Sequence, residues 1–81
     1  MLNPLQIRAA RALIGMSQHE LAQRSEVGLA TVKRIEAAGS DLSGTARTLH
    51  RIQKALEAAG VEFIDGSASH GPGVRLSQPL D

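Results

Sequence analysis

The side chains best suited to metal binding or acid–base chemistry are the three histidines, His19, His50 and His70. They lie far apart in the chain, and no acidic or thiol ligand recurs at a spacing that would complete a metal site with them. The sequence therefore predicts no bound metal and no cofactor.

Two further patterns have the composition of catalytic motifs but lack the required geometry. Ser17, His19 and Glu20 are neighbours at an expected helix start, where adjacent side chains diverge, so they cannot form a Ser–His–acid relay. The segment Gly71-Pro72-Gly73 is not part of a strand-loop-helix unit with a trailing Lys, as a phosphate-binding loop would be. We therefore expect that the protein is not an enzyme.

The remaining candidates for chemistry are the adjacent cations Lys33 and Arg34. The whole chain carries nine Lys and Arg against eight Asp and Glu, a net charge of +1, which by itself says little about a polyanionic partner. Residues 1–40 nevertheless carry more basic than acidic groups, so the sequence is compatible with a basic face in this part of the chain. The alternative interpretation of these two cations is an ordinary solvated helix face.

Composition limits the class of protein that can position these residues. The chain has 81 residues, 42% of them hydrophobic, with Phe63 as its single aromatic residue and no cysteine. This length excludes a multi-domain enzyme, and the missing cysteines exclude disulfide scaffolds and zinc fingers. No segment approaches the length of a membrane span, so we expect a cytoplasmic protein that does not enter a membrane. The thin aliphatic core makes a homodimer the expected form.

Helix start and stop signals predict a mainly α fold of four to five short helices. Asn3, Pro4 and Gln6 begin a helix over 4–14, and Ser17 with Glu20 begins one that ends near residue 24 or 25. A third helix is expected over about 29–37, a loop over 39–44, and a fourth helix from the cap at 45 to the glycine at 60. The apolar positions repeat at helical spacing and define the inward faces. These are Ile7, Ala10 and Ile14 in the first helix, with Leu13 beside them, and Leu49, Ile52, Leu56 and Ala59 in the fourth.

The tail after residue 60 changes from helical to strand-like alternation. Residues 61–64 and 74–76 predict two short strands of a C-terminal β-hairpin, so we divide the chain into a helical domain, 1–60, and an extension, 61–81. An isolated hairpin is barely stable in water, so its apolar residues need helices or a second chain to pack on. We expect Val61, Phe63, Val74 and Leu76 to be buried in an intermolecular sheet.

The most informative segment is 17–36, in which two short helices flank a tight break. The pair would turn five apolar residues inward, with the small Ala22 where the helices cross, and would leave the outer face of the second helix exposed. Such a helix can enter the major groove of B-DNA, which is roughly 12 Å wide. The alternative is an ordinary helical core with no groove-binding role. The inward residues are Leu21, Ala22, Val27, Val32 and Ile35.

The stretch Met16-Ser17-Gln18-His19-Glu20-Leu21-Ala22, with Val27, Thr31-Val32 and Arg34-Ile35-Glu36, resembles the Xre/Cro/phage-repressor class of helix-turn-helix domains. The resemblance covers about residues 4–60. The tail, LEAAGVEFID followed by GPGVRL, resembles a branch of small bacterial Xre-type regulators that end in a short β extension. The resemblance implies a DNA-binding transcriptional regulator.

The resemblance also implies a role for particular positions. Residues that match base-reading positions are Leu29, Ala30, Thr31, Lys33 and Arg34, although Thr31 also suits a phosphate and Leu29 equally suits packing. Gln18 matches a phosphate contact at a helix N-terminus. Arg11 and Glu36 match a pair that forms a partly buried salt bridge between the first and third helices.

The sequence departs from the family pattern at three places. Glu26 stands where a turn glycine is usual, and Gly28 stands where Ser or Thr usually caps the recognition helix. The loop 39–44 is longer than usual and has no basic residue for the phosphate contact commonly made there, so we expect Arg47 to supply it.

Taken together, these patterns predict a regulator, in the first instance a repressor, that binds an inverted repeat of double-stranded DNA as a homodimer. The alternative is an antitoxin-like or accessory interaction module whose extension, 61–81, binds a partner protein by adding a strand to its sheet.

Overall fold

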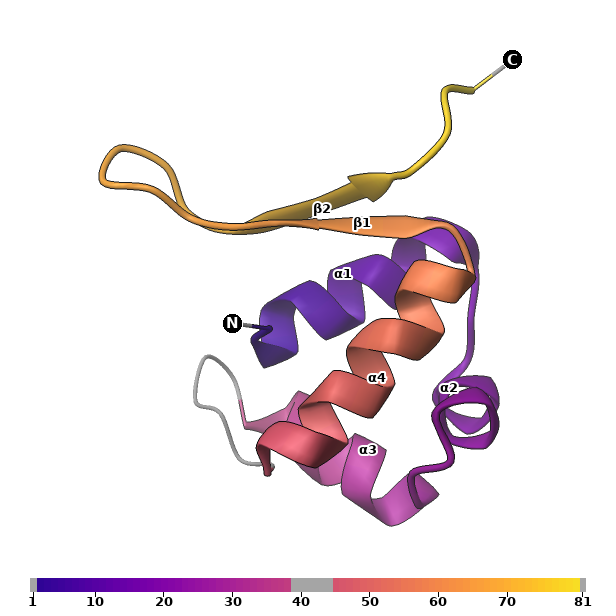
Figure 1. The fold of residues 1–81 in the computed structure, drawn as a ribbon. Helices are drawn as coiled ribbons and strands as arrows, with labels where there is room; N and C mark the ends of the chain where they lie inside the picture. The colour runs from indigo at the N-terminus through magenta and orange to yellow at the C-terminus, as the bar shows by residue number, and fades with distance from the viewer. Residues whose placement is uncertain (1, 39–44, 81) are drawn as a thin grey trace.

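The computed structural model describes residues 2–38 and 45–80, and it contains four helices followed by a two-stranded antiparallel hairpin (Figure 1). The fold is mainly α, as the sequence predicts, and the expected loop 39–44 lies outside the described residues. The elements are α1 (Pro4–Ile14), α2 (Gln18–Ser25), α3 (Leu29–Ala37), α4 (Ala46–Ala58), β1 (Val61–Ile64) and β2 (Gly73–Leu76).

Local capping contacts fix where the helices begin. In α1 the Asn3 side chain accepts from the Gln6 backbone N–H and the Gln6 side chain accepts from the Asn3 N–H, both at 3.0 Å, which is the predicted capping box. In α2 only half of the expected box forms. The Ser17 hydroxyl accepts from the Glu20 N–H at 3.0 Å, while the Glu20 carboxylate pairs with Arg24 at 2.9 Å instead.

The core lies where the four helices meet the first strand. Ile7, Leu21, Ile35 and Ile52 are fully buried within it, with the other core residues around them. Leu13, expected beside the inward stripe of α1, is 42% exposed, so it belongs to the outer face of that helix. The twelve residues of the buried hydrophobic cluster are Leu2, Ile7, Ala10, Met16, Leu21, Ala22, Val32, Ile35, Leu49, Ile52, Leu56 and Val61.

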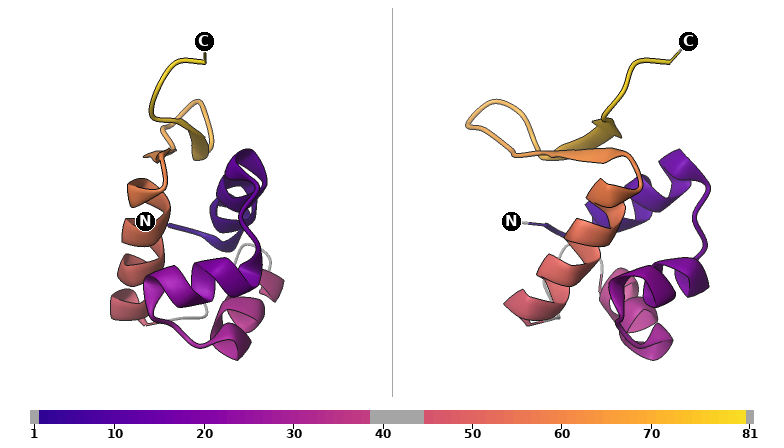
Figure 2. Two further views of the ribbon diagram at one scale, coloured as in Figure 1. Left: turned by 90° about the vertical axis from the view of Figure 1, so that its right-hand side faces the viewer. Right: turned by 45° about the vertical axis from the view of Figure 1, so that its right-hand side comes forward.

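The hairpin lies across α1 and α4, at the opposite end of the molecule from α3 (Figures 1 and 2). Val61 pairs with Leu76 and Phe63 with Val74. The buried Gln6 amide donates to the Ile64 carbonyl at 3.3 Å and to the Gly73 carbonyl at 3.1 Å. These hydrogen bonds connect the start of α1 to the last residue of β1 and the first residue of β2. The hairpin is therefore a fixed part of the helical body.

Across residues 2–38 and 45–80, no helix combines the length and the apolar character that crossing a membrane requires.

Candidate nucleic-acid interface

The interface is built on the packing of α2 against α3. Leu21 from α2 and Val32 and Ile35 from α3 are completely buried, and Ala22 is 8% exposed. Close packing of this kind fixes the angle between two short helices because interior side chains leave few voids. The inward residues expected from the sequence therefore share one core, and they hold α3 by its inner face.

The turn between α2 and α3 contains the one left-handed residue other than glycine in the described chain. Glu26 has φ 56° and ψ 39°, which is the left-handed conformation. This conformation favours glycine, because in other residues the Cβ atom lies too close to the backbone carbonyl oxygen. The Val27 N–H donates to the Ala22 carbonyl at 3.1 Å, and the buried Ser25 hydroxyl donates to the Leu21 carbonyl at 2.6 Å. These contacts close α2 and hold Glu26 in the strained conformation.

The outer face of α3 is open to solvent. Ala30, Lys33 and Arg34 are exposed, whereas Thr31 is half-buried and Leu29 is half-buried against the core. The helix lies at the end of the molecule farthest from the hairpin in every view (Figures 1 and 2). A rod-like partner can therefore approach α3 without meeting the hairpin.

Three cations at this end of the molecule are free of ion pairs within the described residues. Arg24 pairs with Glu20, and Lys54 pairs with Glu57, whereas Lys33, Arg34 and Arg47 have no carboxylate partner there. Arg47 is exposed in the first turn of α4, which begins at the same end of the molecule as α3 (Figure 1). Exposed cations of this kind favour a polyanionic partner.

Glu36, near the end of α3, is the buried charge that locks this helix to the rest of the fold. Its side chain is 3% exposed and accepts from Arg11 Nε at 2.7 Å and from Arg11 Nη2 at 2.6 Å. Gln18 Nε2 donates to the same carboxylate at 3.1 Å. The expected ion pair between α1 and α3 is thus present, and the first residue of α2 joins it. The hydrogen bond to Glu36, against the cost of burial, raises the pKa of Arg11.

Sequence reasoning missed the second arginine of this cluster. The Arg8 guanidinium donates to the Glu36 backbone carbonyl, and Arg11 Nη1 donates to the Met16 carbonyl at 3.0 Å. Arg8 and Arg11 are three residues apart and share one face of α1, which is the sequence signal that could have identified Arg8. Both arginines of α1 therefore help to position α3.

Gln18 has capacity for the phosphate contact that the resemblance implies. Its amide nitrogen carries two hydrogens, and the bond to Glu36 uses one of them. The residue is half-buried at the N-terminus of α2, where the backbone N–H groups also favour an anion. Glu36 therefore orients the Gln18 amide and leaves one donor for a second acceptor.

The four residues expected in an intermolecular sheet lie in the hairpin of a single chain. Val61 is 2% exposed, and Phe63 and Val74 pack against the helical core, while Leu76 is half-buried. The Val61 side chain is already enclosed by its own chain. A second copy would therefore have to use the strand edge and the more exposed side chains.

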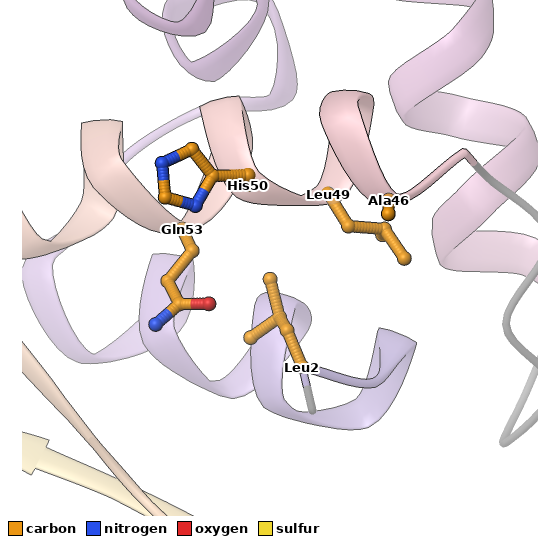
Figure 3. Close-up of a pocket in the computed structure, with 5 residues that line it drawn as sticks. All are labelled: Leu2, Ala46, Leu49, His50 and Gln53. Atoms are coloured by element: carbon orange, nitrogen blue, oxygen red, sulfur yellow. The ribbon is translucent and has the colours of Figure 1, made fainter.

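A small pocket lies beside α4, with a volume of about 140 Å³. Leu2, Ala46, Leu49, His50 and Gln53 line it, and the imidazole and the amide are its only nitrogen-bearing side chains (Figure 3). Among residues 2–38 and 45–80, no three His, Asp or Glu side chains gather as they would around a metal ion.

Comparison with known families identifies the same arrangement. A family model described as helix-turn-helix matches residues 7–64, a span that runs from α1 to the end of β1. No curated protein matches the chain. The matched span includes every residue of the Glu36 cluster and the whole outer face of α3.

The Glu36 cluster predicts a large loss of stability when its charge is removed. Glu36→Gln should lower the free energy of unfolding by about 2–4 kcal/mol, because Arg11 is then left charged and largely buried without a counter-ion. Glu20→Gln makes the same chemical change in an exposed pair and should cost no more than about 0.5 kcal/mol. Urea unfolding of both variants checks this, and equal losses would contradict the structural role of the cluster.

The left-handed turn residue predicts a gain in stability. Glu26→Gly should raise the free energy of unfolding by up to about 1 kcal/mol, because glycine relieves the strain at positive φ. The greater conformational entropy of glycine in the unfolded chain offsets part of this gain. Glu26→Ala keeps the strained backbone and should bring no gain. Thermal unfolding that shows the alanine variant to be as stable as the glycine variant would refute the strain at this turn.

Proposed function

Because the chain belongs to the Xre/Cro-type helix-turn-helix family of DNA-binding regulators, we propose that it is a transcriptional repressor that binds an inverted-repeat operator as a homodimer. The observation that carries the proposal is the exposed outer face of α3, with two cations that form no ion pair with the described residues, on a helix whose inner face is buried. That combination gives a rigid, positively charged rod of the size that the major groove accepts.

Each exposed side chain of α3 suits a different kind of contact to a base. Arg34 carries the planar fork that matches two acceptors of guanine, and Lys33 offers a single flexible donor to the same edge. Ala30 and the exposed part of Leu29 offer apolar contact to a thymine methyl group. Thr31 suits either a base edge or a phosphate. Specificity on this proposal depends chiefly on Arg34.

Phosphate contacts come from residues outside α3. Gln18 donates with its free amide hydrogen, and Arg47 reaches the backbone from the first turn of α4. With a net charge of +1, each copy neutralises few phosphates, so the affinity should fall only modestly as salt increases.

The proposed homodimer is supported by the size of one copy. Its largest extents are 32 Å, close to the about 34 Å that separates equivalent points of the major groove one helical turn apart. Two copies lying side by side therefore present their α3 helices at a spacing suited to successive turns on one face of the duplex.

Two charge-removing substitutions separate base reading from phosphate binding. Arg34→Ala should cost about 1–3 kcal/mol on the preferred operator and little on random duplex DNA, because it removes contacts to base edges. Arg47→Ala should weaken binding to both DNAs by a similar factor and should reduce the salt slope by about one. Arg47 is preferable to Gln18 for this comparison because Gln18 also contacts Glu36.

The matched control is Lys54→Ala. It also removes one positive charge from the protein, but the charge is one that pairs with Glu57. Its affinity for both DNAs should stay close to that of the unchanged protein. Gel-shift titrations at several salt concentrations measure all three variants. If Arg34→Ala weakened random and preferred duplexes equally, α3 would not be the helix that reads the sequence.

A further inference from the structure

The outer edge of β2 has no strand partner among the described residues. The Ser77 N–H donates to the Gly60 carbonyl at 2.9 Å, so residues 60 and 77 form a hydrogen-bonded pair at the end of the ladder. Hydrogen-bonded and non-bonded pairs alternate in an antiparallel sheet. With the observed register, the backbone N–H and C=O groups of Val74 and Leu76 therefore point away from β1, to the free edge.

A groove lies directly beside this edge. Its volume is about 300 Å³, and it runs between the outer face of α1 and the start of β2. Leu5, on the α1 side, is 50% exposed, and Val74 forms part of the opposite wall. The left view of Figure 2 shows β2 on the α1 side of β1 and above α1. The lining residues are Asn3, Leu5, Gln6, Ala9, Pro72, Gly73 and Val74.

The C-terminal residues provide an apolar side chain with nothing to pack on. Leu80 is 84% exposed, the largest value among the exposed large hydrophobic residues. The segment 77–80 leaves β2 and projects from the body of the molecule (Figure 1). An unpaired strand edge, an apolar groove and an unburied leucine thus occur within one short stretch of the fold.

We propose that residues 77–80 of a second copy pair with the free β2 edge and place Leu80 of that copy in the groove beside Leu5. Because the exchange is reciprocal, β2 of one copy runs antiparallel to β2 of the other, and the two hairpins form a four-stranded sheet. The proposal rests on the homodimer of the proposed function and specifies which segment of one copy meets which surface of the other.

Charge and backbone chemistry select the register of this pairing. A two-fold axis at Arg75 would place the two Arg75 side chains directly opposite each other, which is unfavourable. An axis at Val74 would place Pro72, which has no N–H, opposite Leu76. An axis at Leu76 separates the two Arg75 side chains and places Pro72 in the outermost pair, opposite Leu80 of the second copy and at the wall of the groove, so the missing N–H falls at the end of the paired segment.

The alternation of the strand agrees with this register. Successive side chains point to opposite faces, so Leu76, Gln78 and Leu80 share the helix-facing side when residues 77–80 are extended. The same alternation turns the backbone nitrogen of Pro79 away from the second copy, so the missing N–H costs no intermolecular hydrogen bond. Leu80 therefore reaches the helix-facing groove.

Symmetry links the pairing to DNA binding. A continuous antiparallel sheet relates its halves by an axis perpendicular to the sheet, which keeps both helical layers on the same side. Since α3 lies at the end of each copy opposite the hairpin, both α3 helices then face the same way (Figure 1). Back-to-back stacking of the hairpins would point them in opposite directions. Edge pairing therefore lets both α3 helices face one duplex.

Cross-linking of full-length variants tests the register, and the absence of native cysteine makes the result unambiguous. Under mild oxidation Leu76→Cys should form a disulfide-linked dimer, because the two Leu76 Cα atoms should lie about 5.5 Å apart across the axis. Val74→Cys is the matched control and should not cross-link, because each Val74 faces Gln78 of the other copy. Dimeric protein in which Leu76→Cys stays uncrosslinked, or Val74→Cys links more readily, would overturn the proposal.

Substitutions at Leu80 and at Leu5 test the role of Leu80 in the dimer, and analytical sedimentation measures the dimer dissociation constant of each variant. Leu80→Glu and Leu5→Glu should each raise the dimer dissociation constant about tenfold or more, because each charge replaces an apolar contact twice per dimer. Leu80→Met keeps an apolar side chain and should behave like the unchanged protein. A dimer indifferent to Leu80→Glu would overturn this pairing and leave the homodimer standing, whereas a full-length chain that is monomeric at high micromolar concentration would overturn both.

Discussion

The structure depends on one buried carboxylate. Glu36 is surrounded by donors from α1 and α2, and an ionised group can remain in the interior only when it is paired and hydrogen-bonded. Satisfying it requires Arg11, Gln18 and α3 to occupy one relative arrangement. The same contacts turn the exposed residues of α3 outward. The position of the proposed DNA-reading face is therefore set by the buried Glu36 cluster on the inner side of α3. Its base preference would be set by the few exposed residues on the outer side.

The two ends of the molecule have separate physical roles. At the α3 end, exposed polar and cationic side chains project from a rigid frame, which suits a charged partner that changes little in shape. At the hairpin end, Gln6 ties both strands to α1 and leaves a strand edge beside an apolar groove. A thin aliphatic core gives a chain of this length limited stability, so the proposed association at the hairpin end would also stabilise the α3 end.

Local signals in the sequence were sufficient for the elements, because caps and stops act within a few residues. The helix starts at Asn3 and Ser17 could be identified in this way, whereas the unusual turn residue Glu26 was identified from the resemblance to the family, in which glycine is usual at that position. The contacts of Arg8 and Gln6 could not be predicted from local signals. Each joins two residues that are separated by at least 28 and at most 67 positions in the sequence, and only the packed fold brings them together. The enclosure of Val61 is likewise a tertiary effect, since alternation along a strand does not say which surface covers it.

We propose that α3 reads DNA sequence while two copies lie on one face of the duplex. Selection of bound fragments from a pool of random duplexes would show this. We expect an enriched inverted repeat with half-sites about one helical turn apart and with guanine at a fixed position in each half. Enrichment of a single unrepeated site, or binding that enriches no sequence, would contradict it.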